Sequence, residues 1–128
     1  MSYYFAKTVN KNMTDTRSMV EAKLKDAGFG IVSEINMTEK FKDKLGIDFR
    51  PYLILGACSP KHAHKAVSGE EHIGLMLPCN VVLQQKSEGE TEVSVIDPVA
   101  SMMAVQNEVL APVAAEIQAN LKKFITAL

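Results

Sequence analysis

Two thiols, a hydroxyl and an imidazole are the side chains in this sequence with the clearest chemical potential. Cys58, Ser59 and His62 occur in one short stretch, and Cys79 with Asn80 follows later in the chain. Two thiols can form a redox pair or bind a soft metal ion, although these two lack the C-x-x-C spacing of a redox motif. Cysteine is also among the most frequently buried residues and packs like a small apolar side chain. Both interpretations remain open from the sequence.

The histidines extend this group only slightly. His62 and His64 fall in a predicted helix, where residues two apart point to different sides, so only His62 is a candidate ligand beside the cysteines. His72 falls in an irregular segment and is interpreted as a solvated side chain. A zinc site needs four well-placed ligands. We therefore predict no metal and no other cofactor.

Basic residues between the second and third predicted strands suggest a different kind of site. Lys40, Lys42, Lys44 and Arg50 form a basic cluster that could receive a small anionic molecule, especially beside the helix start at Ser59, where free N–H groups favour anions. The alternative is a solvated helix face, because nearby Asp43 and Asp48 neutralise part of the charge. We carry Lys44 and Arg50 as candidate ligand-binding residues.

A catalytic constellation is not evident from the sequence. Asp97 is explained as a helix cap before Pro98, and no spacing pairs it with Glu34. Asn80 could hold a loop as well as meet a ligand. Since no nucleophile, base and orienting group occur together, the sequence favours a non-enzymatic protein.

Length, composition and net charge indicate a single folded domain and argue against nucleic acid and membranes as partners. The 128 residues suit a single domain over 1–128, and 47% hydrophobic residues can form a core. The net charge of -1 supplies no attraction for nucleic acid or a membrane surface. We find neither a secretory signal pattern nor a long apolar run, so we expect a cytoplasmic protein with reduced thiols.

The elements that would position these residues follow from periodicity and turn signals. β-branched or alternating residues predict strands at 3–9, 29–37, 52–58, 81–86 and 91–96. Capping residues and apolar stripes predict helices capped by Thr14 or Asp15, at 39–45 after Thr38, at 61–67, after Asp97, and within 107–128.

Finer features complete the predicted fold. Segment 52–58 is the most apolar and is expected to be the central strand, while 73–78 reads as an extended linker. A four-residue loop at 87–90 predicts a hairpin, and Pro112 predicts a kink or a helix start. The order of elements predicts an α+β fold, with a mainly antiparallel sheet and helices on one face. Such pairing would bring Cys58 and Cys79 to the same end of the sheet.

Several ordered motifs carry a family resemblance. They are the runs Gly-Phe-Gly-Ile-Val-Ser-Glu-Ile at 28–35, Lys-Leu-Gly at 44–46, Phe-Arg-Pro-Tyr at 49–52, Ile-Leu-Gly-Ala-Cys-Ser-Pro at 54–60, Ile-Gly-Leu-Met-Leu-Pro-Cys-Asn-Val-Val at 73–82 and Ile-Asp-Pro at 96–98. Together they closely resemble the domain of unknown function 302, DUF302, from about Tyr4 to Met103.

The resemblance implies a fold similar in topology to the TATA-box-binding-protein-like class (β-α-β4-α) and a homodimer, with no established activity. It carries no DNA-binding inference, because function belongs to sites rather than folds. The chain departs from the family pattern at Asn36, where members tend to carry Asp, and at Ser59, where they tend to carry Asn.

Two functional hypotheses follow. The first is a homodimeric small-molecule-binding or accessory domain, with a ligand near Cys58, Ser59, Cys79 and Asn80. The alternative is a thiol-based redox, sulfur-handling or metal-handling protein that uses Cys58 and Cys79. Thiol pKa and accessibility distinguish the two, because a reactive cysteine needs an exposed, electropositive setting.

Overall fold

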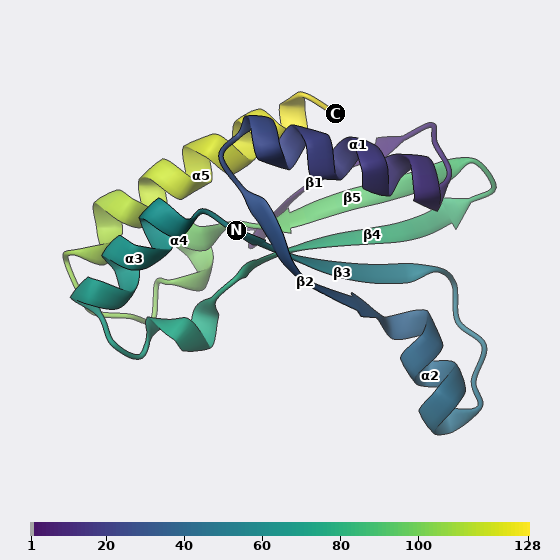
Figure 1. The fold of residues 1–128 in the computed structure, drawn as a ribbon, viewed down its shortest axis with the longest axis horizontal. Coiled ribbons are helices and arrows are strands. Elements are labelled where there is room, and N and C mark those ends of the chain that lie inside the picture. Colours follow the sequence, from purple (N-terminus) through teal and green to yellow (C-terminus); the bar gives the residue numbers. More distant parts are fainter. Residues whose placement is uncertain (1) are drawn as a thin grey trace.

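The chain folds around one five-stranded sheet in which every neighbouring pair is antiparallel. The computed structural model describes residues 2–128, and the strand order is β1-β5-β4-β3-β2 (Figure 1). The strands are β1 (Tyr4–Val9), β2 (Gly30–Asn36), β3 (Tyr52–Cys58), β4 (Cys79–Ser87) and β5 (Glu90–Ile96). The predicted antiparallel α+β fold is therefore confirmed.

Two long helices cover one face of this sheet. The helical elements are α1 (Met13–Asp26), α2 (Met37–Leu45), α3 (Pro60–Gly69), the 3-10 helix η1 (Ile73–Met76), α4 (Pro98–Ser101) and α5 (Leu110–Thr126). In Figure 1, α1 and α5 lie above the strands. With α1 after β1 and α5 after β5, the chain has the expected β-α-β4-α order, into which α2, α3 and α4 are inserted.

The core lies between the sheet and these two helices. Alternate residues of β4 and β5 face it, so Val81, Leu83, Val93 and Val95 are at most 1% exposed while their neighbours face the other side. The predicted stripe of α5 is buried from Leu110 to Ile125. Pro112 stands at the third residue of α5, where a missing N–H costs nothing, and the helix therefore begins near it as expected.

Two helix caps differ from the prediction. The side chain of Asn12, rather than Thr14 or Asp15, accepts the bond from Asp15 N and caps α1. Asn36 caps α2 in the same way by accepting from Glu39 N. Thr38 was the expected cap of α2, but its hydroxyl instead donates to Arg50 O and accepts from Tyr52 N.

Three further expectations are corrected. The central strand is β4, because β3 lies one position nearer the edge. Segment 73–78 is not extended, since Ile73 turns into the core and starts η1. The hairpin loop is shorter than the four residues expected: Ser87 pairs with Glu90, and Gly89 adopts a positive φ of 77° in the turn.

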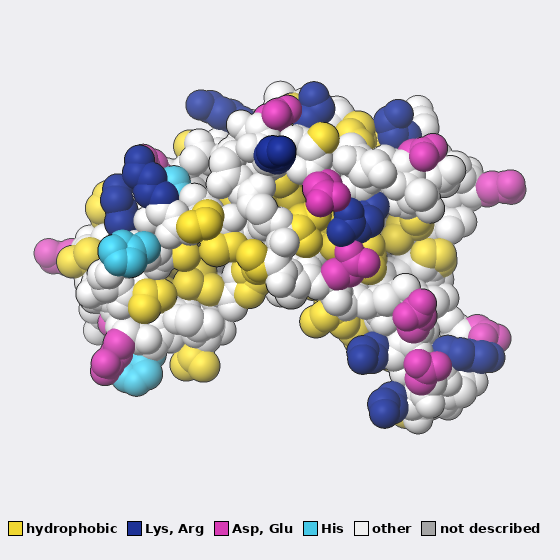
Figure 2. All heavy atoms as spheres, in the orientation of Figure 1, with side chains coloured by type: hydrophobic (Ala, Val, Ile, Leu, Met, Phe, Trp, Pro, Cys, Tyr) yellow, Lys and Arg dark blue, Asp and Glu magenta, His cyan; other side chains and the backbone are white. Residues whose placement is uncertain are grey.

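The opposite face of the sheet is not covered by a helix. Helix α2 points away from the body on that side, and the space-filling view shows a hollowed surface between it and the region of α3 and η1 (Figure 2). No residue of α2 is buried. Strand β2, at the edge beside it, carries a register irregularity between Ile31 and Ser33. Within residues 2–128, no helix has the length and apolarity needed to cross a membrane.

Candidate functional site

The antiparallel pairing of β3 with β4 determines where the two thiols lie. Ala57 pairs with Cys79, so Cys58, the next residue of β3, lies at the same end of the sheet as Cys79. Both cysteines are free. This agrees with the predicted proximity of the two thiols.

A small cavity brings together four of the residues singled out in the sequence. Cys58, Ser59, His62 and Cys79 line a space of about 20 Å³, whose remaining walls are apolar side chains that include Phe29 and Ile117. A space of this size holds about one water molecule or a methyl group. We call this space the Cys58 cavity.

The chemistry of this cavity argues against a reactive thiol pair. Cys79 is 5% exposed, and burial, followed by the charge of Cys58, raises the pKa of its thiol to about 11. At neutral pH the thiol of Cys79 is therefore protonated, whereas the thiolate is the nucleophile and the metal ligand. No group of three or more His, Cys, Asp or Glu side chains is placed to hold a metal ion in the part of the chain that the structure describes.

We expect Cys79 to resist alkylation in the folded protein. Iodoacetamide at pH 7.5 should leave Cys79 unmodified for hours and modify it within minutes after denaturant is added, because burial and a raised pKa both suppress the thiolate. Peptide mass mapping at timed intervals measures this. Half-buried Cys58 is the internal comparison. Rapid alkylation of native Cys79 would restore the redox alternative.

Ser59 and His62 are in contact, and a third polar residue that the sequence did not indicate, Glu116, lies beside them. Ser59 Oγ lies 2.7 Å from His62 Nδ1, and His62 is 8% exposed. On the other side of the ring, Nε2 lies 3.4 Å from Glu116 Oε2 but makes no hydrogen bond. A hydroxyl, an imidazole and a carboxylate thus lie close together, although the imidazole and the carboxylate are not hydrogen-bonded.

Glu116 was missed because its position depends on tertiary structure. It lies on α5, next to the buried Ile117, and packing of α5 against α3 brings it to His62. Nothing in the sequence marks Glu116 as functional, because exposed carboxylates are common on the polar faces of amphipathic helices. The other histidines behave as predicted: His64 and His72 are exposed.

Asn80 points the other way. As the neighbour of Cys79 on β4, it faces the uncovered side of the sheet. There it contributes to a hollow of about 350 Å³, which we call the open-face hollow. The hollow is lined by three tyrosines and by polar and apolar residues of the inner strands: Tyr3, Tyr4, Tyr52, Asn80, Val82, Gln84, Glu92, Ser94, Val95 and Ile96.

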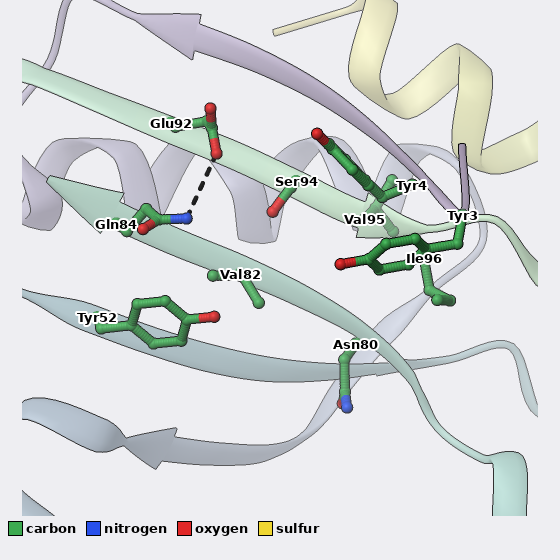
Figure 3. Close-up of a pocket in the computed structure, with 10 residues that line it drawn as sticks. All are labelled: Tyr3, Tyr4, Tyr52, Asn80, Val82, Gln84, Glu92, Ser94, Val95 and Ile96. Atoms are coloured by element: carbon green, nitrogen blue, oxygen red, sulfur yellow. Dashed lines mark hydrogen bonds between the residues drawn. The ribbon is translucent and has the colours of Figure 1, made fainter. Parts of the chain in front are cut away.

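The open-face hollow has a polar floor between aromatic ends. Figure 3 shows Tyr3 and Tyr52 approaching from opposite ends, with Val82 between them and the polar side chains of Ser94 and Asn80 on either side. Gln84 Nε2 lies 3.4 Å from Glu92 Oε1, and Gln84 Oε1 accepts two bonds from the guanidinium of Arg50, at 2.8 and 3.0 Å. Arg50 thereby stands at the edge of the hollow and orients the Gln84 amide.

The candidate residues therefore separate into different places. Cys58, Ser59, His62 and Cys79 share the Cys58 cavity, while Asn80 lines the open-face hollow and Arg50 stands beside it. Lys44 lies in the last turn of α2, which projects from the body on the side away from α3 (Figure 1). The predicted basic cluster does not meet the start of α3 at Ser59.

The chain is an α+β fold whose sheet has one covered and one open face, with the Cys58 cavity and the open-face hollow on opposite sides of β4. The chain belongs to the DUF302 family, described as a domain of unknown function, whose model matches residues 5–128. The crystal structure of an uncharacterised conserved DUF302 protein from Bacillus stearothermophilus is similar, with 28% identity over 98% of both chains and a TM-score of 0.89. Comparison with curated proteins gives no match.

Proposed function

We propose that this chain is a cytoplasmic, homodimeric domain that binds a small polar molecule in the open-face hollow. The observation that carries the proposal is the hollow itself, which has a volume of about 350 Å³ and is lined by tyrosines and by amide, hydroxyl and carboxylate groups. Ligand sites combine apolar or aromatic walls with a few polar groups that fix orientation. The guanidinium of Arg50, which is held on Gln84 at the edge of the hollow, would attract a negatively charged group on the ligand.

Dimer formation is supported by the exposed α2 arm, which we define as residues 37–50. A helix of nine residues is marginal in water without packing partners, yet no α2 residue is buried. Leu45 is 64% exposed, and Ile47 is 52% exposed in the segment that follows. A second copy supplies the missing contacts if the arm of each copy packs over the open sheet face of the other, in a self-complementary interface.

The thiol-based alternative has less support. It needs an accessible thiolate pair, and the buried Cys79, with its pKa raised to about 11, does not supply one. A free pair of cysteines is compatible with a reducing compartment and supports the cytoplasmic location.

Native mass spectrometry of freshly purified protein tests both parts of the proposal. We expect a dimer at tens of micromolar protein, with a mass excess from a retained small molecule. Ile47→Glu should give monomer, because a charge in an apolar interface is unfavourable, whereas Val67→Glu, equally exposed on α3, should leave the dimer intact.

A second variant in the same mass-spectrometry experiment tests whether the ligand binds in the open-face hollow. Tyr3→Ala combined with Asn80→Ala removes two exposed lining side chains and should abolish the mass excess, while Val32→Ala outside the hollow should retain it. A monomeric wild-type protein without a mass excess would contradict the proposal.

A further inference from the structure

The beginning of α3 contains an unusual arrangement of its first polar groups. Ser59 is the N-cap residue, but its side chain makes no capping bond to the helix backbone. Its hydroxyl faces His62 Nδ1 at 2.7 Å instead. The first backbone N–H groups of a helix have no partner within the helix, so those of Lys61 and His62 stay available for an oxygen atom near Ser59.

His62 supplies the second, independent observation. Its ring is buried, with 8% of the residue exposed, and lines the Cys58 cavity. Its Nε2 atom is the single buried side-chain nitrogen or oxygen without a hydrogen bond among residues 2–128. Such an unpaired buried group is unfavourable and calls for an explanation, of which a catalytic role is one. Glu116 Oε2, at 3.4 Å from Nε2, is the nearest acceptor.

From this geometry we propose that Ser59, His62 and Glu116 form an acyl-transfer site for esters of a short acyl group. Ser59 is the nucleophile, and His62 is the general base through Nδ1. Glu116 is a positioning residue whose carboxylate accepts a hydrogen bond from the N–H group at Nε2. This tautomer places the free lone pair of Nδ1 on the serine hydroxyl. The distance from Nε2 to Glu116 shortens into a hydrogen bond when substrate binds, as catalytic contacts commonly do.

The reaction balances with the ester and water alone. Ser59 Oγ attacks the ester carbonyl as its proton passes to His62 Nδ1, and the carbonyl oxygen turns toward the N–H groups at the start of α3. The bond to the leaving oxygen then breaks, and that oxygen takes the proton from Nδ1. Water, deprotonated by the same nitrogen, attacks the acyl-Ser59. The bond to Ser59 Oγ then breaks, Oγ takes the proton back from Nδ1, and a carboxylic acid is released. The products are one alcohol and one acid.

Cavity size determines the class of acyl group. The space beside Ser59 measures about 20 Å³ and has mostly apolar walls, among them Phe29 and Ile117. It accommodates a methyl group and excludes a longer chain. We therefore expect acetyl esters to react faster than butyryl esters. The site is separate from the open-face hollow, because Cys79 and Asn80 face opposite sides of β4.

Covalent labelling tests this directly on the full chain. We expect a fluorophosphonate probe to label the wild-type protein, and peptide mass mapping to place the adduct on Ser59. The same protein should hydrolyse p-nitrophenyl acetate faster than the butyrate ester.

Variants on the same helix provide matched controls. Ser59→Ala and His62→Gln should each lower the rate by about 100-fold or more, whereas Ser68→Ala and His64→Gln, both at exposed positions of α3, should leave it unchanged. Glu116→Gln should lower the rate and alter its pH profile, and Glu108→Gln should do neither. Circular dichroism establishes that each variant is folded.

Three results would overturn the proposal. They are wild-type protein that the probe does not label, an adduct on a residue other than Ser59, and hydrolysis by folded Ser59→Ala at the wild-type rate. The labelling result needs no variant, so it remains decisive if His62→Gln does not fold. Preference for the butyrate ester would overturn the assignment of the Cys58 cavity as the acyl site.

Discussion

Replacing Leu121 by alanine is expected to lower the free energy of unfolding by about 2 to 5 kcal/mol, as other large truncations of core residues do. Leu121 lies in the middle of α5 and is 0% exposed, and Phe124 one turn later is 1% exposed. The loss combines the transfer free energy of the removed atoms with the cavity left between α5 and the sheet. Phe124→Ala should behave similarly.

Urea unfolding followed by circular dichroism measures this effect. Lys123→Ala, at an exposed position of the same helix, is the control and should change the free energy of unfolding by less than about 0.5 kcal/mol. Losses below about 0.5 kcal/mol in both Leu121→Ala and Phe124→Ala would show that α5 does not pack on the sheet with this face.

Gly56→Ala is the second substitution with a large expected effect. A Cβ at Gly56 would overlap Ser33 Oγ and lie 2.6 Å from Pro78 Cγ, closer than carbon atoms approach in proteins. Relief of this overlap requires β3 to move relative to β2 or to the entry of β4, and overpacking of this kind costs about 1 to 3 kcal/mol.

A second glycine separates crowding from a general cost of replacing glycine. A Cβ at Gly74 would meet no atom within 4 Å, and Gly74 lacks a positive φ. Gly74→Ala should therefore leave the thermal midpoint within a degree or two, whereas Gly56→Ala should lower it by several degrees. Equal midpoints for the two variants would mean that β2, β3 and Pro78 do not meet at Gly56.

The strands and the terminal helix were predictable because local patterns determine them. The apolar stripe of α5 and the alternation in β5 each place apolar residues on one face, and burial follows that face in the structure. Glycine at position 46 ends α2 with a left-handed backbone, at φ 66°, as its position after the helix predicts.

The N-cap residues of the helices and the order of the strands were less predictable, because both depend on contacts with residues distant in the sequence. Thr38 and Asn36 are both suitable N-cap residues, and the outcome depends on Arg50 and Tyr52, which occupy the Thr38 hydroxyl. Likewise, the apolar run of β3 indicated burial, but strand order depends on long-range pairing that no local pattern records.

The candidate sites show the same division. The proximity of Cys58 and Cys79 followed from antiparallel pairing of adjacent strands, which is a local topological rule. No local rule predicts the position of Glu116 or the open-face hollow, because both depend on tertiary packing that brings together residues distant in the sequence. The basic cluster was separated from Ser59 because α2 projects away from the body.

The irregularity in β2 has a consequence for how copies of this chain can associate. Strand β2 is an edge of the sheet, and an edge with regularly spaced backbone N–H and C=O groups is a template for strand addition and fibrous aggregation. The extra residue at Val32 interrupts that spacing, and Asn36 turns the chain straight into α2. Lateral growth of the sheet is thereby hindered at the β2 edge, so β1, whose pairing with β5 is regular, is the edge at which a strand of another copy could still be added.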